Sequence, residues 1–159
     1  MNGIVAVYSY SGYSRAAAKI AAEVSGWPLY ELEVTPPYSG GYWKMVARVG
    51  AEFLGGSERK VTPVPEIIEP ADRVILAMPT WWFTYARPLH PWVRQADWQG
   101  RGLYALLTCG GNPGRSRQDL EQDSGGALAD LLVVRRPKGA AVPEREEIAA
   151  WVTDVVMKQ

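Results

Sequence analysis

The sequence predicts one α/β domain over residues 1–159, with a five-stranded parallel sheet of order 2-1-3-4-5 in a three-layer α/β/α arrangement. Five strand-like runs alternate with helical patterns, which is typical of right-handed βαβ crossovers. The first and third runs are apolar at nearly every residue, as in strands buried on both faces. The loops after the first, third and fourth runs are rich in Gly, hydroxyl and aromatic residues. In this strand order they meet at the edge where open α/β sheets bind ligands.

The first half of the chain is expected to contain two strands and two helices, followed by a polar connection. The strands are predicted at Gly3–Tyr8 and, nearer an edge of the sheet, at Trp27–Val34, and a helix is predicted over Ser14–Val24. The second helix is stopped by Gly55-Gly56 and has Lys44, Arg48 and Glu52 opposite an apolar face of Trp43, Val46, Ala47, Gly50, Phe53 and Leu54. The proline-bearing stretch Ser57–Pro70 is expected to be a surface loop.

The second half is expected to contain three strands, each followed by a helix. The strands are predicted at Arg73–Met78, Gly102–Thr108 and Leu131–Val134. The helices are predicted from Pro88 to about Gln95, from Ser116 to Gln122, and from Pro143 onwards. The last helix is the clearest, because acidic residues occupy its first turn and its apolar stripe runs from Ile148 to Val156 at i, i+3, i+4, i+7 and i+8.

Composition narrows the class of protein. The chain carries 17 basic and 17 acidic residues, so its net charge gives no positive electrostatic field that would attract nucleic acid. No apolar run approaches the roughly 18–20 residues of a membrane span, and the N-terminus lacks the pattern of a signal peptide. Cys109 is the only cysteine, which excludes an internal disulfide and fits a reducing cytosol, so a cytoplasmic protein without membrane insertion is expected.

The loop after the first strand predicts an anion site. It consists of Ser9, Tyr10, Ser11, Gly12, Tyr13 and Ser14. Unpaired N–H groups and the dipole at the start of the following helix favour a phosphate, and the three serines can donate hydrogen bonds to it. No Lys or Arg lies between residues 1 and 14, so that phosphate is expected to be held mainly by neutral N–H and O–H dipoles. The plainer alternative is a βα turn with serine caps.

Two further loops carry candidate ligand contacts. After the third strand come Pro79, Thr80, Trp81, Trp82 and Phe83, whose indoles can stack on a flat ring, although one Trp is expected to be structural. After the fourth strand come Thr108, Cys109, Gly110, Gly111 and Gly114, where paired glycines free backbone N–H groups; the alternative is a plain Gly-rich loop. Cys109 by itself is expected to be a small buried hydrophobe and His90 a satisfied or surface histidine. No His/Cys cluster indicates a metal.

These loops resemble those of the flavodoxin-like family. Ser9–Ser14 is similar to its phosphate loop, [S/T]-x-[S/T]-G-x-[S/T]. Pro79–Thr84 resembles the P-x-W-W-x-T segment of a bacterial subfamily, and Thr108–Ser116 resembles its T-x-G-G-x-x-G-R-S segment. The resemblance implies an FMN cofactor, with its phosphate at the first loop and its ring system between the other two. The residue after the Trp pair is often Gly in that subfamily and is Phe83 here.

Three functions stay open on the sequence alone. The first is electron transfer to a redox partner protein, although such carriers are usually strongly acidic and this chain is neutral. The second is an FMN-dependent NAD(P)H oxidoreductase acting on a small quinone-like acceptor. The third is a non-catalytic binding module on the same fold. The oligomeric state, including a homodimer, is not determined by the sequence.

Overall fold

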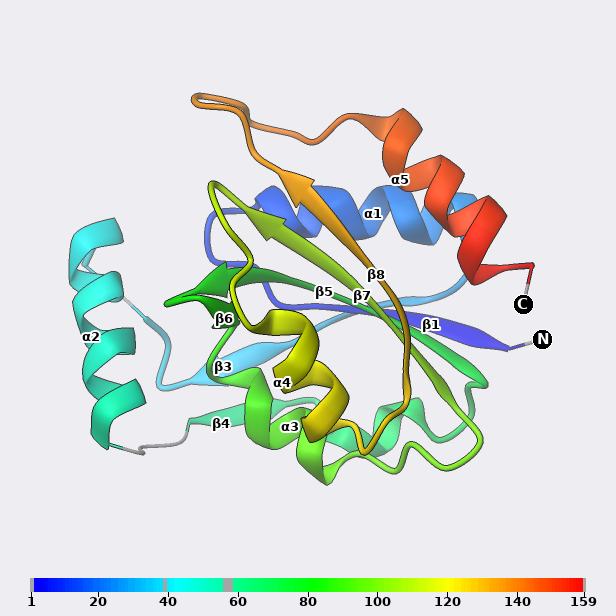
Figure 1. The fold of residues 1–159 in the computed structure, drawn as a ribbon, viewed down its shortest axis with the longest axis horizontal. Coiled ribbons are helices and arrows are strands. Elements are labelled where there is room, and N and C mark those ends of the chain that lie inside the picture. Colours follow the sequence, from blue (N-terminus) through cyan, green and yellow to red (C-terminus); the bar gives the residue numbers. More distant parts are fainter. Residues whose placement is uncertain (1, 39, 56–58, 159) are drawn as a thin grey trace.

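The main sheet has the predicted order and direction. The computed structural model describes residues 2–38, 40–55 and 59–158, and in it five strands pair in parallel in the order β2-β1-β5-β7-β8 (Figure 1). Their bounds are β1 Gly3–Val7, β2 Leu29–Glu31, β5 Arg73–Trp81, β7 Gly102–Cys109 and β8 Leu128–Arg135. The carboxyl ends of these strands therefore lie at one edge, as the predicted order requires.

Helices cover both faces of the sheet. Helix α1 (Tyr13–Ser25), helix α5 (Arg145–Trp151) and the π-helical turn η2 (Val152–Val156) pack on one face (Figure 1). Helix α3 (Leu89–Gln95) and helix α4 (Ser116–Asp123) lie on the other face. Strand residues alternate between the two cores, with Val5 in the first and Ile4 in the second, which explains why the strands are apolar throughout.

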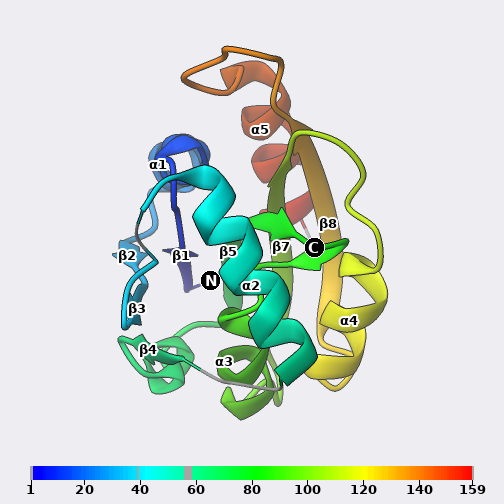
Figure 2. The same ribbon diagram turned by 90° about the vertical axis from the view of Figure 1, so that its left-hand side faces the viewer.

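Helix α2 (Tyr42–Gly55) lies in front of the carboxyl ends of the strands instead of on a face of the sheet (Figure 2). Its predicted apolar face is only partly correct: Val46 packs against the core and Gly50 is buried, but Trp43 and Leu54 are 79% and 88% exposed, and the unpredicted Met45 and Val49 are buried. A helix that crosses strand ends needs only a narrow apolar stripe. The predicted stop at Gly55 is the end of α2, and Gly56 lies outside the described residues.

A small second sheet was not predicted. The run expected as one strand at Trp27–Val34 ends its pairing with β1 at Glu31, and the chain then forms β3 (Glu33–Thr35). Strand β3 pairs antiparallel with β4 (Lys60–Thr62), and the 3₁₀ helix η1 (Pro65–Ile68) follows. The expected surface loop is therefore wrong over these residues, since Val61 and Ile68 are buried in the core; Ser57 and Glu58 lie outside the described residues.

The last strand differs from prediction at its ends, and the predicted last helix is divided into α5 and the π-helical turn η2. Strand β8 begins at Leu128, whereas the predicted strand began at Leu131, so the polar residue Asp130 lies inside the strand. The indole Nε1 of Trp151 donates to the Asp130 carboxylate at 2.7 Å, which accounts for a carboxylate inside a strand. Within the described residues, no helix is both long and apolar enough to cross a membrane.

Candidate functional site

The loop after β1 exposes free hydrogen-bond donors at the start of α1. Gly12 takes the left-handed conformation with φ of 92°, which glycine adopts readily, and its N–H donates to Ser9 Oγ at 2.9 Å. The Ser14 hydroxyl is 2.7 Å from Thr108 Oγ1 and so ties this loop to the end of β7. Within the described chain, the N–H groups of Ser11, Tyr13 and Ser14 donate to no protein acceptor. They remain available to an anion.

These donors lie at the wall of a cavity of about 220 Å³. Every loop predicted to hold a ligand contributes to its lining, which comprises Tyr10, Ser11, Tyr13, Ser14, Pro79, Thr80, Trp81, Thr108, Cys109 and Gly110, with Met45 of α2 and Arg136 added. Ser9 and Gly12 support the loop through their mutual hydrogen bond. The convergence predicted from strand order is therefore present in the structure.

A second cavity of about 400 Å³ adjoins the first and shares Met45, Thr80, Trp81 and Gly110 with it. It is lined mainly by apolar and aromatic side chains, with Gly111 and Asn112 from the loop after β7 (Met45, Val46, Val49, Thr80, Trp81, Trp82, Phe83, Gly110, Gly111 and Asn112). Within the described residues, the N–H groups of Gly110 and Gly111 donate to no protein acceptor. A flat ring with carbonyl groups could use both the aromatic wall and these donors.

The stretch predicted as a loop after the third strand is a tight β-hairpin. Strand β5 continues to Trp81, and β6 (Thr84–Tyr85) returns antiparallel to it. The two turn residues, Trp82 and Phe83, have φ of 54° and 63°. Positive φ at both turn residues matches the twist of a two-residue hairpin but is uncommon for bulky side chains. Phe83 thus occupies the conformation that Gly adopts readily.

The two tryptophans of the hairpin have different surroundings. Trp81 packs edge-to-face against Tyr8, Tyr10 and Tyr38, with ring centroids 5.6, 6.1 and 5.5 Å away. Trp82 is 46% exposed, and its Nε1 donates to the carbonyl of Val46 in α2 at 2.8 Å. Trp81 is thus the more structural of the pair, while both line the second cavity.

Helix α2 is held over this site by contacts with the hairpin and with Tyr38 and Arg59. A side chain at Gly50 would place its Cβ 2.6 Å from the Trp82 indole, so the absence of a side chain lets α2 approach the hairpin. Farther along α2, Glu52 accepts from the Tyr38 hydroxyl at 2.5 Å and pairs with Arg59 at 2.6 Å. Burial and the Glu52 carboxylate raise the pKa of Tyr38, so its hydroxyl stays protonated and donates.

The loop after β7 fixes the hairpin turn from the other side. Gly114 has φ of 59°, and a Cβ there would lie 2.2 Å from the carbonyl oxygen of Phe83. The next residue, Arg115, donates its backbone N–H to that same oxygen at 2.7 Å. Gly114 therefore lines neither cavity but is needed for the close approach of the two loops.

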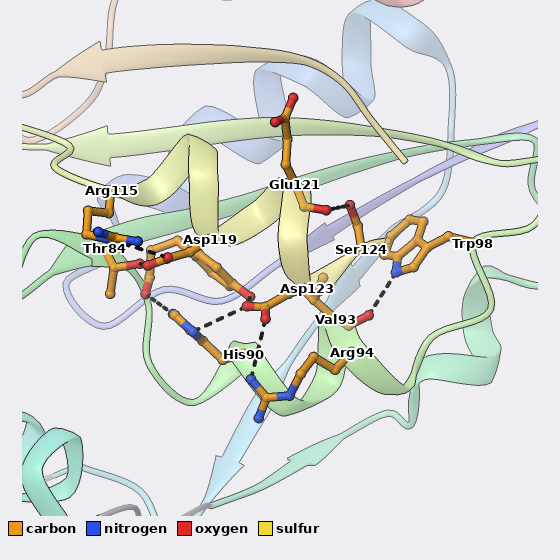
Figure 3. Close-up of polar contacts among 11 residues, drawn as sticks. Thr84, His90, Val93, Arg94, Trp98, Arg115, Asp119, Glu121, Asp123 and Ser124 are labelled. Carbon is orange, nitrogen blue, oxygen red and sulfur yellow. Dashed lines mark hydrogen bonds and ion pairs between the residues drawn. The ribbon is translucent and has the colours of Figure 1, made fainter. Parts of the chain in front are cut away.

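Strand β6 is anchored to α4 by a buried polar network (Figure 3). Thr84 donates to Asp119 at 2.6 Å, and the Tyr85 hydroxyl donates to Asp123. His90 stacks on Tyr85 with 3.8 Å between ring centroids, lies 3.4 Å from Asp123 through Nδ1, and contacts the Tyr85 carbonyl through Nε2 at 2.9 Å. His90 is thus the satisfied histidine that was expected. Burial lowers its pKa below the ordinary value of 6.5.

Two contributions to the site were not found in the sequence. Met45 and Val49 come from a helix whose apolar face was only partly predicted, and Arg136 comes from the chain just after β8. This cation adds a charged group to a loop that was expected to act mainly through neutral dipoles. Strand β8 was predicted, and its carboxyl end at the ligand edge was the available signal. Cys109 is buried as expected, and its Sγ is 3.2 Å from the Gly111 carbonyl oxygen.

The residues at this edge fit a flat, phosphate-bearing cofactor. Free N–H donors and hydroxyls lie at one end, and an aromatic-walled cavity adjoins it, so the fold and site are those of an α/β protein with adjoining cavities at the carboxyl ends of its strands. A family model described as Flavodoxin matches residues 2–155. The chain therefore belongs to the flavodoxin family.

Solved structures support the same fold. A protein of Bacteroides eggerthii is 20% identical with a TM-score of 0.81, covering 99% of both chains. A Lactobacillus acidophilus flavoprotein in complex with FMN is 16% identical with a TM-score of 0.69, covering 83% of this chain and 92% of its own. Flavodoxin 1 from Bacillus cereus is 13% identical with a TM-score of 0.62, covering 100% and 99%. A search of curated proteins gave no match.

Proposed function

We propose that this protein binds FMN at the two adjoining cavities and takes part in electron transfer. The observation that carries the proposal is the shared wall of Thr80, Trp81 and Gly110, which joins a donor-rich end to an aromatic end. That a flavoprotein of the same fold was solved with FMN supports the choice of cofactor. When bound, FMN supplies one- and two-electron redox chemistry, and the protein supplies its position and surroundings.

The residues would divide the binding between them. Ser11, Tyr13 and Ser14 would hold the phosphate through N–H groups and hydroxyls. Gly110 and Gly111 would donate backbone N–H groups to the ring carbonyls. Trp81, Trp82, Phe83 and Met45 would exclude water from the ring and hold it in place.

Titration of flavin-stripped protein with FMN tests the proposal. The expected result is saturable binding of one FMN per chain, with a change in flavin absorbance and quenching of flavin emission. Absence of binding would favour the third possibility, a module that uses the fold without the cofactor.

An FMN-dependent oxidoreductase is the second candidate, and one observation favours it. The chain balances 17 acidic against 17 basic residues, so it lacks the acidic field that steers carriers to basic partners. Consumption of NADPH by the FMN-loaded protein with a quinone would identify a reductase. Reduction only through a partner protein would identify a carrier. A cytoplasmic location, proposed from the single cysteine, fits either role.

A further inference from the structure

The chain that follows β8 brings a cation to the phosphate loop. Arg136 donates its backbone N–H to the Cys109 carbonyl at 2.8 Å, so its position is fixed at the end of β7. Its Nη1 donates to Ser11 Oγ at 3.0 Å, and its guanidinium carbon lies 4.8 Å from the centre of the Tyr13 ring. A contact between Arg136 and the Ala140 carbonyl at 2.9 Å completes its support.

Unlike Arg15 and Arg145, Arg136 has no carboxylate partner within the described part of the chain. Arg15, in the first turn of α1, is paired with Glu31 at 2.6 Å. Arg145, at the start of α5, is paired with Glu23 at 2.6 Å. At the wall of the first cavity, the Arg136 guanidinium is therefore not paired with a carboxylate within the described residues.

We infer that Arg136 is a phosphate-binding residue, which recognises a phosphate monoester in the first cavity together with Ser11 and the N–H groups of Tyr13 and Ser14. Since Ser11 Oγ accepts from Arg136, its own hydrogen is free to turn toward the anion. The guanidinium has further N–H groups for charge-assisted bonds to phosphate oxygens. This inference deepens the proposed function, because FMN carries the phosphate and riboflavin does not.

The test compares FMN with riboflavin in charge-matched variants. Arg136→Gln and Arg145→Gln each remove one positive charge, so a general effect of net charge would be equal in both. Arg136→Gln is expected to weaken FMN about tenfold or more and leave riboflavin within about twofold, because only FMN loses a charge-assisted bond. Arg136→Lys should lose less, since it keeps the charge. The control Arg145→Gln should alter neither affinity, and high salt should narrow the FMN difference.

A second readout does not need flavin. In the flavin-free protein, the NMR signal of the Arg136 Nε–H group, assigned by its absence in Arg136→Gln, is expected to shift when inorganic phosphate is added. The Arg145 signal should stay in place. Because no flavin is present in this experiment, a shift shows that Arg136 binds an anion whether or not the protein binds flavin.

The outcomes distinguish the two proposals. If FMN binds and Arg136→Gln weakens FMN and riboflavin equally or not at all, the inference about Arg136 is overturned and the flavin function stands. If no flavin binds but phosphate shifts the Arg136 signal, the anion site stands and the flavin function fails. If neither flavin nor phosphate has an effect, both are overturned.

Discussion

The contact between Gly114 and the hairpin turn gives a prediction whose size follows from the structure. In Gly114→Ala the new Cβ would lie 2.2 Å from the Phe83 carbonyl oxygen and 2.7 Å from its Cα, whereas ordinary contacts begin at 3.4 Å. These atoms belong to the backbone, so the two loops must separate by about 1 Å. That movement would lengthen the 2.7 Å bond from Arg115 N–H to the same oxygen.

The expected cost of Gly114→Ala is the sum of three effects. Alanine at a φ of 59° costs about 1–2 kcal/mol relative to glycine. Weakening a backbone hydrogen bond adds about 0.5–1.5 kcal/mol, and residual overlap adds more. We therefore expect Gly114→Ala to lower the free energy of unfolding by about 2–4 kcal/mol. FMN affinity should fall too, because Phe83 lines the second cavity.

Alanine variants at two other glycines, Gly126 and Gly111, separate the conformational cost from the cost of the close contact. Gly126 has φ of 89° with no atom within 4 Å of an added Cβ, so Gly126→Ala should cost only the conformational part, about 1–2 kcal/mol. Gly111 has neither a positive φ nor a neighbour within 4 Å, so Gly111→Ala should change stability by less than about 1 kcal/mol. Urea unfolding of the three flavin-free variants, followed by Trp fluorescence, measures the differences. A Gly114→Ala cost no greater than that of Gly126→Ala would refute the close contact.

Three further predictions test the site. Replacing Ser9, Ser11 and Ser14 together by Ala should weaken FMN far more than riboflavin in a binding titration, and equal losses would place the phosphate elsewhere. Trp81→Leu or Trp82→Leu should raise bound-flavin emission, whereas Trp43→Leu, on the exposed side of α2, should not; no rise in either hairpin variant would move the ring away from this loop. Because burial lowers the pKa of His90 in the folded state, the unfolded chain binds more protons below pH 6.5. Unfolding free energy should therefore fall on acidification below that pH, and less steeply in His90→Gln, as measured by urea titrations; parallel curves would contradict this assignment.

The sequence predicted those features that depend on neighbours along the chain. The strand order and the meeting of three loops follow from local patterns and from the rules of parallel sheets. The buried face of α2 could not be predicted in full, because apolar residues lie on several sides of this helix. Only its position over the strand ends determines that Met45 and Val49 are buried. The contact of Arg136 with the loop after β1 could not be predicted either, because Arg136 lies 125 residues from Ser11 and only the folded strand β8 brings the two together.

The hairpin turn places two bulky residues, Trp82 and Phe83, in a left-handed conformation that other contacts must stabilise. Trp82 and Phe83 each cost about 1–2 kcal/mol there. Three bonds oppose this cost: Thr84 and Tyr85 donate to the carboxylates of Asp119 and Asp123, and Arg115 donates to the Phe83 carbonyl. Bonds to charged acceptors contribute about 1.5–3 kcal/mol each and a backbone bond about 0.5–1.5 kcal/mol, which is enough to offset the turn. The network in Figure 3 therefore stabilises the aromatic wall of the second cavity from behind, without contacting the ligand that the wall would hold.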